Sequence, residues 1–289
     1  MIHTLTYNNL SISVNEFGAE LISLKKNGVE YLYDGNPKYW DEQSPILFPV
    51  CGRLYQSYYT YGGKRYEMGI HGIAKHNRFT VTEKTENSIS LTLFADEKTL
   101  KSYPFDFELT ITYTVIESGL KVTFTVKNND DKLMYFSLGG HPGFKVPINN
   151  QGDFTDYYLE FKSETPAKKL FISPTALPVN KDPLYKNGML KKIPLEHSVF
   201  DNDDMFFVDS AKEVSLKSDK YPSSITANFE NFNYIGFWQA SKTDADYVCI
   251  EPWLGSPSND APVELTTKKD MIKLSFNETY ENSYAITLK

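Results

Sequence analysis

The sequence predicts an all-β fold, and three observations support this class. Hydrophobic and polar residues alternate with a period of two along several segments, which is the pattern of half-buried strands. Aromatic residues, which are favoured in strands, are abundant, with 20 Tyr, 19 Phe and 3 Trp. Helical periodicity is scarce, while turn residues are frequent. Many strands separated by frequent turns indicate a sandwich or a barrel.

The longest alternation lies in YPFDFELTITYTVI, where every second residue from Phe105 to Val115 is apolar. The segment LKVTFTVKNND repeats the pattern in Val122, Phe124 and Val126 and then breaks at an Asn-Asn-Asp turn. Three further segments predict strands in the same way: 88–94, 223–230 and 271–289.

The stretches between the predicted strands are short. One short helix is expected within 95–103, and the Pro- and Asn-rich stretches 147–153 and 173–188 are expected to be loops between strands. No stretch has the composition of a domain linker, and the sequence contains no internal repeat. A chain of 289 residues is long enough to bury a large core, so we expect one continuous domain over residues 1–289.

Composition and charge exclude several classes of function. The net charge of −7 argues against a general nucleic-acid binder, which needs a basic face. No long apolar run could span a membrane, and the start MIHTLTYNNL lacks the charged and apolar regions of a signal peptide. The two cysteines, Cys51 and Cys249, have the spacing of neither a disulfide framework nor a zinc site. We therefore expect a cytoplasmic protein, a monomer or a homodimer, with no membrane or nucleic-acid partner.

Five stretches combine reactive side chains with turn residues. The side chains are Arg53 in ILFPVCGRL, His71 in GIHGIAKHNRF, His141 in YFSLGGHPGF, Asp203 in FDNDDMFF, and Glu251 with Trp253 in YVCIEPWLGSP. Glycines beside the two histidines permit close approach of a ligand. Glu251 follows an apolar run, and a carboxylate in such surroundings has its pKa raised towards the range of a general base. Taken alone, Arg53 is more often a surface residue and Trp253 a core residue.

Other catalytic devices are missing from the sequence. It has no nucleophile elbow, no dinucleotide or Walker loop and no HExxH motif. His71 and His76 are five residues apart, which on a strand places them on opposite faces and makes a poor metal pair. The remaining side chains suit a reaction that needs an acid and a base, without a cofactor or a metal.

The stretches ILFPVCGRL, IHGIAKHNRF, YFSLGGHPGF, FDNDDMFF and YVCIEPWLG, in this order and spacing, resemble the aldose 1-epimerase (galactose mutarotase) family, most closely its LacX-like branch. The resemblance extends from about Leu10 to Leu288. It implies a large antiparallel β-sandwich of the galactose mutarotase type and an isomerase that interconverts the α and β anomers of an aldohexose.

The resemblance also implies roles for single residues. Glu251 falls on the base that takes the proton from the C1 hydroxyl, and His141 on the acid that protonates the ring oxygen. His71 and Arg53 fall on groups that bind and polarise sugar oxygens, and Asp203 falls on a carboxylate that accepts a hydrogen bond from a sugar hydroxyl. Trp253, two residues after Glu251, is also expected to bind the sugar, although the resemblance does not assign this role. The neighbouring Asp204 leaves the position of that carboxylate open.

The residues around the catalytic types depart from the family pattern. Gly140 and Pro142 flank His141 where galactose mutarotases usually have an Asn-His pair and an aromatic stretch, and Pro252-Trp253 replaces Thr-Gln after the glutamate. The resemblance therefore supports the acid–base chemistry of the family more strongly than it supports any particular sugar as substrate.

Three alternatives stay open. A hexose-6-phosphate 1-epimerase would hold the phosphate with basic residues such as Lys64, Arg65, Lys75 or Arg78. A carbohydrate-binding or sensing protein of the same fold would lack turnover. A glycoside hydrolase would use Asp203 and Glu251 as its two carboxylates.

Overall fold

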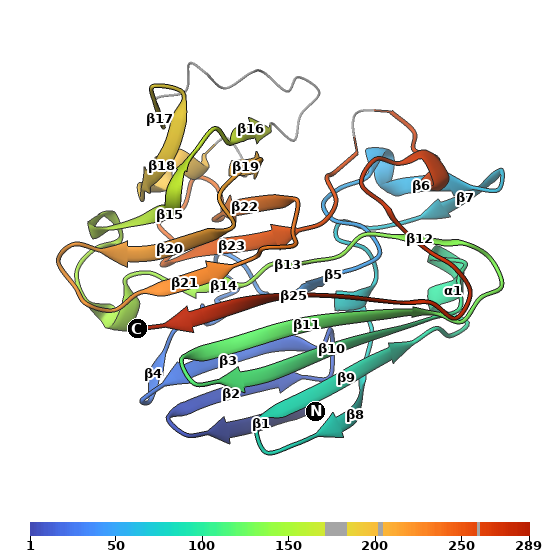
Figure 1. The fold of residues 1–289 in the computed structure, drawn as a ribbon, viewed down its shortest axis with the longest axis horizontal. Helices are drawn as coiled ribbons and strands as arrows, with labels where there is room; N and C mark the ends of the chain where they lie inside the picture. Colours follow the sequence, from blue (N-terminus) through green and yellow to red (C-terminus); the bar gives the residue numbers. More distant parts are fainter. Residues whose placement is uncertain (171–183, 202–204, 259–260) are drawn as a thin grey trace.

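The computed structural model describes residues 1–170, 184–201, 205–258 and 261–289 of the chain (Figure 1). Within these ranges the chain forms twenty-five strands, one α-helix and six short 3-10 turns. The all-β class is thus confirmed, and the strands gather into two large sheets and three small ones.

The larger sheet has ten antiparallel strands. In spatial order they are β17 (Tyr185–Lys186), β18 (Met189–Pro194), β15 (Tyr157–Thr165), β20 (Glu213–Ser218), β21 (Ile225–Asn228), β25 (Thr279–Leu288), β11 (Gly119–Asn128), β10 (Phe107–Ile116), β9 (Ser88–Phe94) and β8 (Thr80–Lys84). Figure 1 shows β25 crossing the middle of the molecule, where it joins β11 on one side to β21 on the other.

The predicted alternation is confirmed in this sheet. In β10 every second residue from Phe107 to Val115 is buried, and the residues between them are partly exposed. The strands expected at 88–94, at 120–126 and within 223–230 are β9, β11 and β21. The segment 271–289 was expected as one strand, but it forms β24 (Ile272–Leu274) and β25. A turn closed by a hydrogen bond from the Glu278 N–H to the Ser275 carbonyl separates the two.

The second large sheet packs against the first. Its antiparallel strands are β16 (Lys168–Leu170), β19 (Met205–Val208), β22 (Tyr234–Trp238), β23 (Tyr247–Trp253), β13 (Gly139–Gly140) and β5 (Ile46–Leu47), with β14 (Gly143–Lys145) also paired to β23. The Phe161 ring of β15 lies 6.4 Å from that of Phe207 and 5.9 Å from that of Phe237, centroid to centroid. These contacts join the two sheets into an antiparallel β-sandwich.

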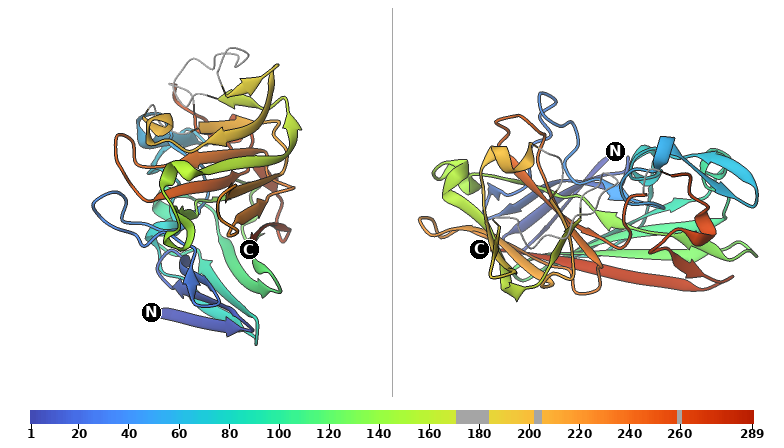
Figure 2. Two further views of the ribbon diagram at one scale, coloured as in Figure 1. Left: turned by 90° about the vertical axis from the view of Figure 1, so that its left-hand side faces the viewer. Right: turned by 90° about the horizontal axis from the view of Figure 1, so that it is seen from above.

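The small sheets lie around the sandwich (Figures 1 and 2). They are the four-stranded sheet β1 (Ile2–Tyr7), β2 (Leu10–Asn15), β3 (Glu20–Lys26) and β4 (Val29–Glu30), the hairpin β6 (Tyr58–Tyr61) and β7 (Lys64–Glu67), and the pair β12 (Met134–Phe136) and β24. In Figure 1 and in the left view of Figure 2 the amino-terminal strands lie at the opposite end of the molecule from β17 and β18.

The connections agree with the sequence in most places. The helix α1 (Thr99–Ser102) lies within 95–103, as predicted. The connection 147–153 carries only the 3-10 turn η3 (Ile148–Asn150). Of 173–188 the structure describes 184–188, and there the loop prediction is wrong, because β17 pairs with β18 as a short hairpin. Among the described residues, the helices are too short to cross a membrane. The single-domain expectation stays a prediction.

The strand β23 has two buried faces with different roles. Val248 and Ile250 point into the main core. Tyr247, Cys249 and Trp253 belong to two smaller clusters on the other side, and Glu251 shares their parity in the strand. Since side chains alternate along a strand, this second face brings Glu251 and its neighbours to the site described next.

Candidate active site

Four of the predicted site residues line one cavity of about 360 Å³. They are Arg53, His71, His141 and Trp253. Glu251 lies directly behind His141, with its Oε2 atom 3.2 Å from the Nε2 atom of the histidine. Asp203 and Asp204 lie outside the described residues, so the role predicted for Asp203 stays a prediction. The structure thus brings together five of the six predicted side chains, which are distant in the sequence.

His141 is held against β23 by the chain on both sides of it. Gly139 pairs with Trp253, Gly143 pairs with Cys249, and the carbonyl of Pro142 accepts a hydrogen bond from the Ile250 N–H (3.1 Å). A Cβ atom at Gly139 would lie 2.9 Å from the Pro252 carbonyl oxygen. Gly139, two residues before His141, is therefore required by the close approach of two backbones.

The two residues predicted as acid and base are deeply buried. His141 is 7% exposed and Glu251 is 1% exposed. Burial lowers the pKa of His141 to about 3, and the charge of Lys75 acts in the same direction. In the free protein at neutral pH the His141 imidazole is therefore uncharged.

His71 is fixed in one orientation by Gly52. The backbone N–H of Gly52 donates to His71 Nδ1 (3.1 Å), and the backbone N–H of His71 donates to the Gly52 carbonyl (2.9 Å). Because Nδ1 accepts a hydrogen bond, the neutral ring carries its hydrogen on Nε2. Burial is the main cause that holds the pKa of His71 well below its usual range, and the charges of Lys75 and Arg53 act in the same direction. His71 is thus a neutral hydrogen-bond donor in the wall of the cavity.

His71 and His76 do not lie on a strand, and the structure separates them in another way. His71 has a φ of 65° and lies in a loop, while His76 ends the turn η2 (Ala74–His76). The left-handed conformation of His71 is uncommon for a residue other than glycine, and such conformations gather at functional sites. His76 lines a different cavity.

The remaining predicted residues differ in exposure. Arg53 is exposed at the edge of the cavity. Trp253 is 1% exposed and packs edge-on against His71, with ring centroids 5.4 Å apart, and against Phe206 at 4.9 Å. Trp253 is therefore both a buried core residue and a residue of the cavity wall.

Two tryptophans of the site were not predicted from the sequence. Trp40 and Trp238 line the cavity, and their ring centroids lie 5.1 and 5.5 Å from that of His141. With Trp253, they are all three tryptophans of the chain. Their rarity was the available signal, but nothing in the spacing of 40, 238 and 253 indicates that they meet. Trp238 reaches the site because it pairs with Cys249 across β22 and β23.

The basic residues suggested for a phosphate are scattered. Only Lys75 lines the cavity, and it forms an ion pair with Glu42 (2.9 Å). Arg78 pairs with Glu16 (2.7 Å) and Arg65 with Glu67 (2.8 Å). Lys64 lies in β7, in the same hairpin as Arg65.

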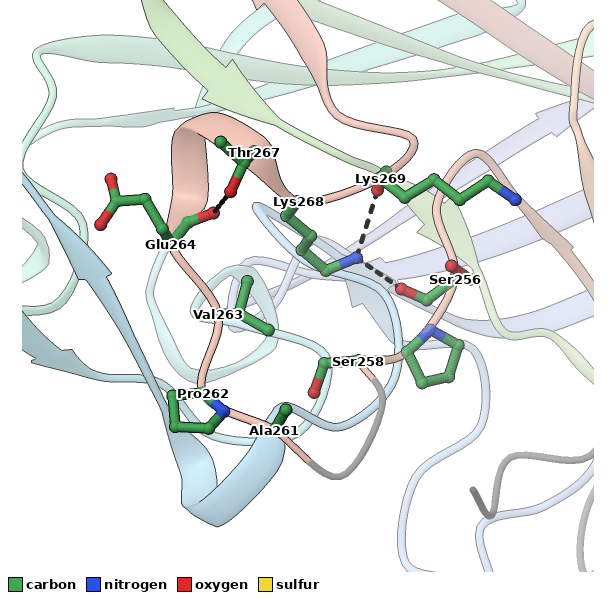
Figure 3. Close-up of a pocket in the computed structure, with 10 residues that line it drawn as sticks. Ser256, Ser258, Ala261, Pro262, Val263, Glu264, Thr267, Lys268 and Lys269 are labelled. Atoms are coloured by element: carbon green, nitrogen blue, oxygen red, sulfur yellow. Dashed lines mark hydrogen bonds between the residues drawn. The ribbon is translucent and has the colours of Figure 1, made fainter. Parts of the chain in front are cut away.

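A second cavity, of about 250 Å³, shares Pro257 with the first (Figure 3). Lys268 is directed into it, and its Nζ donates to the carbonyl oxygens of Ser256 (2.6 Å) and Lys269 (3.5 Å). Of the five predicted site residues that the structure describes, none lines this second cavity.

Comparisons with known proteins relate this chain to one family and one fold. The sequence profile described as "Aldose 1-epimerase" matches residues 1–287. Protein LacX (chromosomal) of Lactococcus lactis subsp. lactis is 30% identical over 96% of both chains. A galactose mutarotase related enzyme from Lactobacillus acidophilus is 32% identical, with a TM-score of 0.91 over 100% of this chain and 97% of that one. A galactose mutarotase-like protein from Lactobacillus casei is 30% identical, with a TM-score of 0.91 over 100% of both.

Proposed function

Because this chain belongs to the aldose 1-epimerase family, we propose that it interconverts the α and β anomers of an aldohexose by opening and reclosing the pyranose ring. The observation that carries the proposal is the contact between Glu251 and His141 behind a cavity lined by tryptophans. A carboxylate and an imidazole in contact provide the base and the acid that ring opening needs.

In the proposed mechanism the two groups share one mobile proton. When this proton is on His141, the Glu251 carboxylate takes the proton of the C1 hydroxyl while His141 donates its own to the ring oxygen O5. The C1–O5 bond breaks, its electron pair stays on O5, and C1 becomes an aldehyde. After rotation about C1–C2 the steps run in reverse. A site that excludes water strengthens each electrostatic interaction along this path.

Other residues bind the sugar in this proposal. His71 donates a hydrogen bond from Nε2, and the exposed Arg53 at the cavity edge contacts sugar oxygens. The aromatic faces of Trp40 and Trp238, which contact the His141 ring, suit the apolar C–H faces of a pyranose. Asp203 stays the predicted acceptor of a sugar hydroxyl.

The proposal is tested by polarimetry on freshly dissolved α-glucose and α-galactose, with native protein and Glu251→Gln side by side. The native protein should shorten the approach to equilibrium, and the variant should lose about 10²–10⁴-fold in kcat, the usual contribution of a general base. Circular dichroism of the variant controls for folding. A carbohydrate-binding protein would bind sugar without turnover in either form, and equal rates in both would overturn the role of Glu251.

A hexose-6-phosphate is the second candidate substrate, because Arg53 and Lys75 both line the cavity. Because Lys75 is already paired with Glu42, we rank the phosphorylated sugar second to the free sugar. NMR exchange measurements on glucose and galactose 6-phosphates decide between them. Inhibition of the free-sugar reaction by inorganic phosphate would favour the phosphorylated substrate.

A further inference from the structure

Cys249 lies beside the acid–base pair and has no part in the proposed reaction. One ligand atom each from His141, Cys249 and Glu251 lie within 4.8 Å of one another, and all three residues are buried. The proposed opening of the sugar ring does not require the sulfur atom.

The fold explains why this cluster is hidden in the sequence. Cys249 and Glu251 are two residues apart on β23, so their side chains leave the same face of the strand. His141 joins them because β14 and β13 pair with β23 on either side of it. The three residues do not follow a Cys-x-x-Cys or His-x-x-x-His spacing, and the sequence alone predicted no metal site.

The distances fit tetrahedral coordination by a soft divalent cation. Bond lengths of about 2.1 Å to nitrogen and oxygen and about 2.3 Å to sulfur place neighbouring ligand atoms of a tetrahedron roughly 3.3–3.6 Å apart. The 3.2 Å between His141 Nε2 and Glu251 Oε2 is already close to such an edge. Small side-chain rotations would bring the third atom, now within 4.8 Å, to the same range.

The charges also match. A divalent cation bound by a cysteine thiolate, a glutamate carboxylate and a neutral imidazole forms a complex of zero net charge, which suits a buried site. Binding releases two protons, one from the thiol and one from the acid–base pair. Because His141 lines the cavity, a water molecule or a sugar hydroxyl can take the fourth position.

We propose that His141, Cys249 and Glu251 form a binding site for a thiophilic divalent cation such as Zn²⁺, and that the bound cation inhibits the enzyme. The cation takes the place of the mobile proton and holds both the acid and the base as its ligands. Only the inhibition rests on the proposed function, since binding of the metal is a separate property of the three side chains.

Binding is tested with Co²⁺, whose coordination by a thiolate produces a charge-transfer band in the near ultraviolet. We expect this band in the native protein and its loss in Cys249→Ser and Cys249→Ala. The chain has only two cysteines, so Cys51→Ser is the matched control and should keep the band. This control decides the question even where the Cys249 variants fail to fold. Absence of the band from native protein, or its loss in Cys51→Ser, would overturn the proposal.

Inhibition is tested by polarimetry with Zn²⁺, comparing for each protein the rates with and without the metal. A chelator should restore the native rate, and Cys249→Ser should need at least about tenfold more Zn²⁺ for half inhibition, because one of three ligands is weakened. Equal sensitivity of the two proteins would show that the sulfur takes no part. A protein that shows the cobalt band but no turnover with any sugar would retain the metal site and lose the proposed epimerase activity.

Discussion

At the scale of single residues, hydrogen bonds fix the orientation of the His71 ring. Both its backbone N–H and its Nδ1 atom form hydrogen bonds with Gly52. A ring held in this way, with its pKa well below the usual range through burial, donates from Nε2 and does not accept a proton near neutral pH. The resemblance implies that His71 binds and polarises sugar oxygens, and this geometry favours that role over one in proton transfer.

Substitution of His71 separates these two roles. We predict that His71→Asn raises KM about fivefold to tenfold, the loss of roughly one neutral hydrogen bond, with a smaller change in kcat. Asparagine is chosen because it tolerates the positive φ of this position better than most residues. Steady-state rates of mutarotation give both constants.

The control for this substitution is His76→Asn, because His76 lines a different cavity. It should leave both constants near their native values. A large fall in kcat of His71→Asn at unchanged KM would instead assign His71 to proton transfer.

Among the elements, β23 and the segment 139–145 decide the positions of Glu251 and His141. The segment pairs with β23 before and after His141, and its backbone approaches so closely that a side chain at Gly139 would meet Pro252 and Trp253. The Gly-Gly-His-Pro stretch is therefore the means by which a histidine reaches a glutamate on the neighbouring strand.

We predict that Gly139→Ala lowers the free energy of unfolding by about 1–3 kcal/mol, as overpacking of a well-packed site does. It should also reduce turnover, because the strand carrying Glu251 must shift. Urea unfolding monitored by tryptophan fluorescence gives the stability.

Gly69→Ala is the matched control, since no atom lies within 4 Å of a Cβ placed there. It should change the stability by less than about 1 kcal/mol. A Gly139→Ala protein as stable as Gly69→Ala would contradict the close approach of the two backbones.

At the scale of the whole molecule, burial of two histidines links stability to pH. The pKa of His141 is lowered from 6.5 to about 3, and that of His71 is also lowered well below 6.5. The unfolded chain therefore binds protons below about pH 6.5 that the folded protein does not. The free energy of unfolding is therefore highest above pH 6.5, and it decreases as the pH falls below this value, because protons then bind preferentially to the unfolded chain.

We predict that the free energy of unfolding falls between pH 6.5 and 5.5 with a slope that rises towards about 1.4 kcal/mol per pH unit for each buried histidine. Urea unfolding at several pH values measures the slope. In His141→Gln the slope should decrease by the share of one proton. An unchanged slope in this variant would mean that His141 binds its proton equally well in the folded protein.

The sequence alone determined the strands whose hydrophobic period is two over many residues, such as β9, β10 and β11, because alternation is a local consequence of having one buried face. It also determined the types of the reactive side chains and the family to which they belong. It did not reveal the left-handed conformation of His71, because a residue other than glycine gives no local signal of that conformation.

Only the tertiary structure decided which side chains meet. Pairing between β22 and β23 brings Trp238 beside Cys249, and the fold places both of them and Trp40, which lies outside the strands, next to the Glu251–His141 pair. The same holds for the neutral state of His141, which depends on burial by the whole sandwich. Sequence patterns report which face of an element is buried, whereas the distances between elements follow from how the two sheets pack. The geometry of the site depends on those distances.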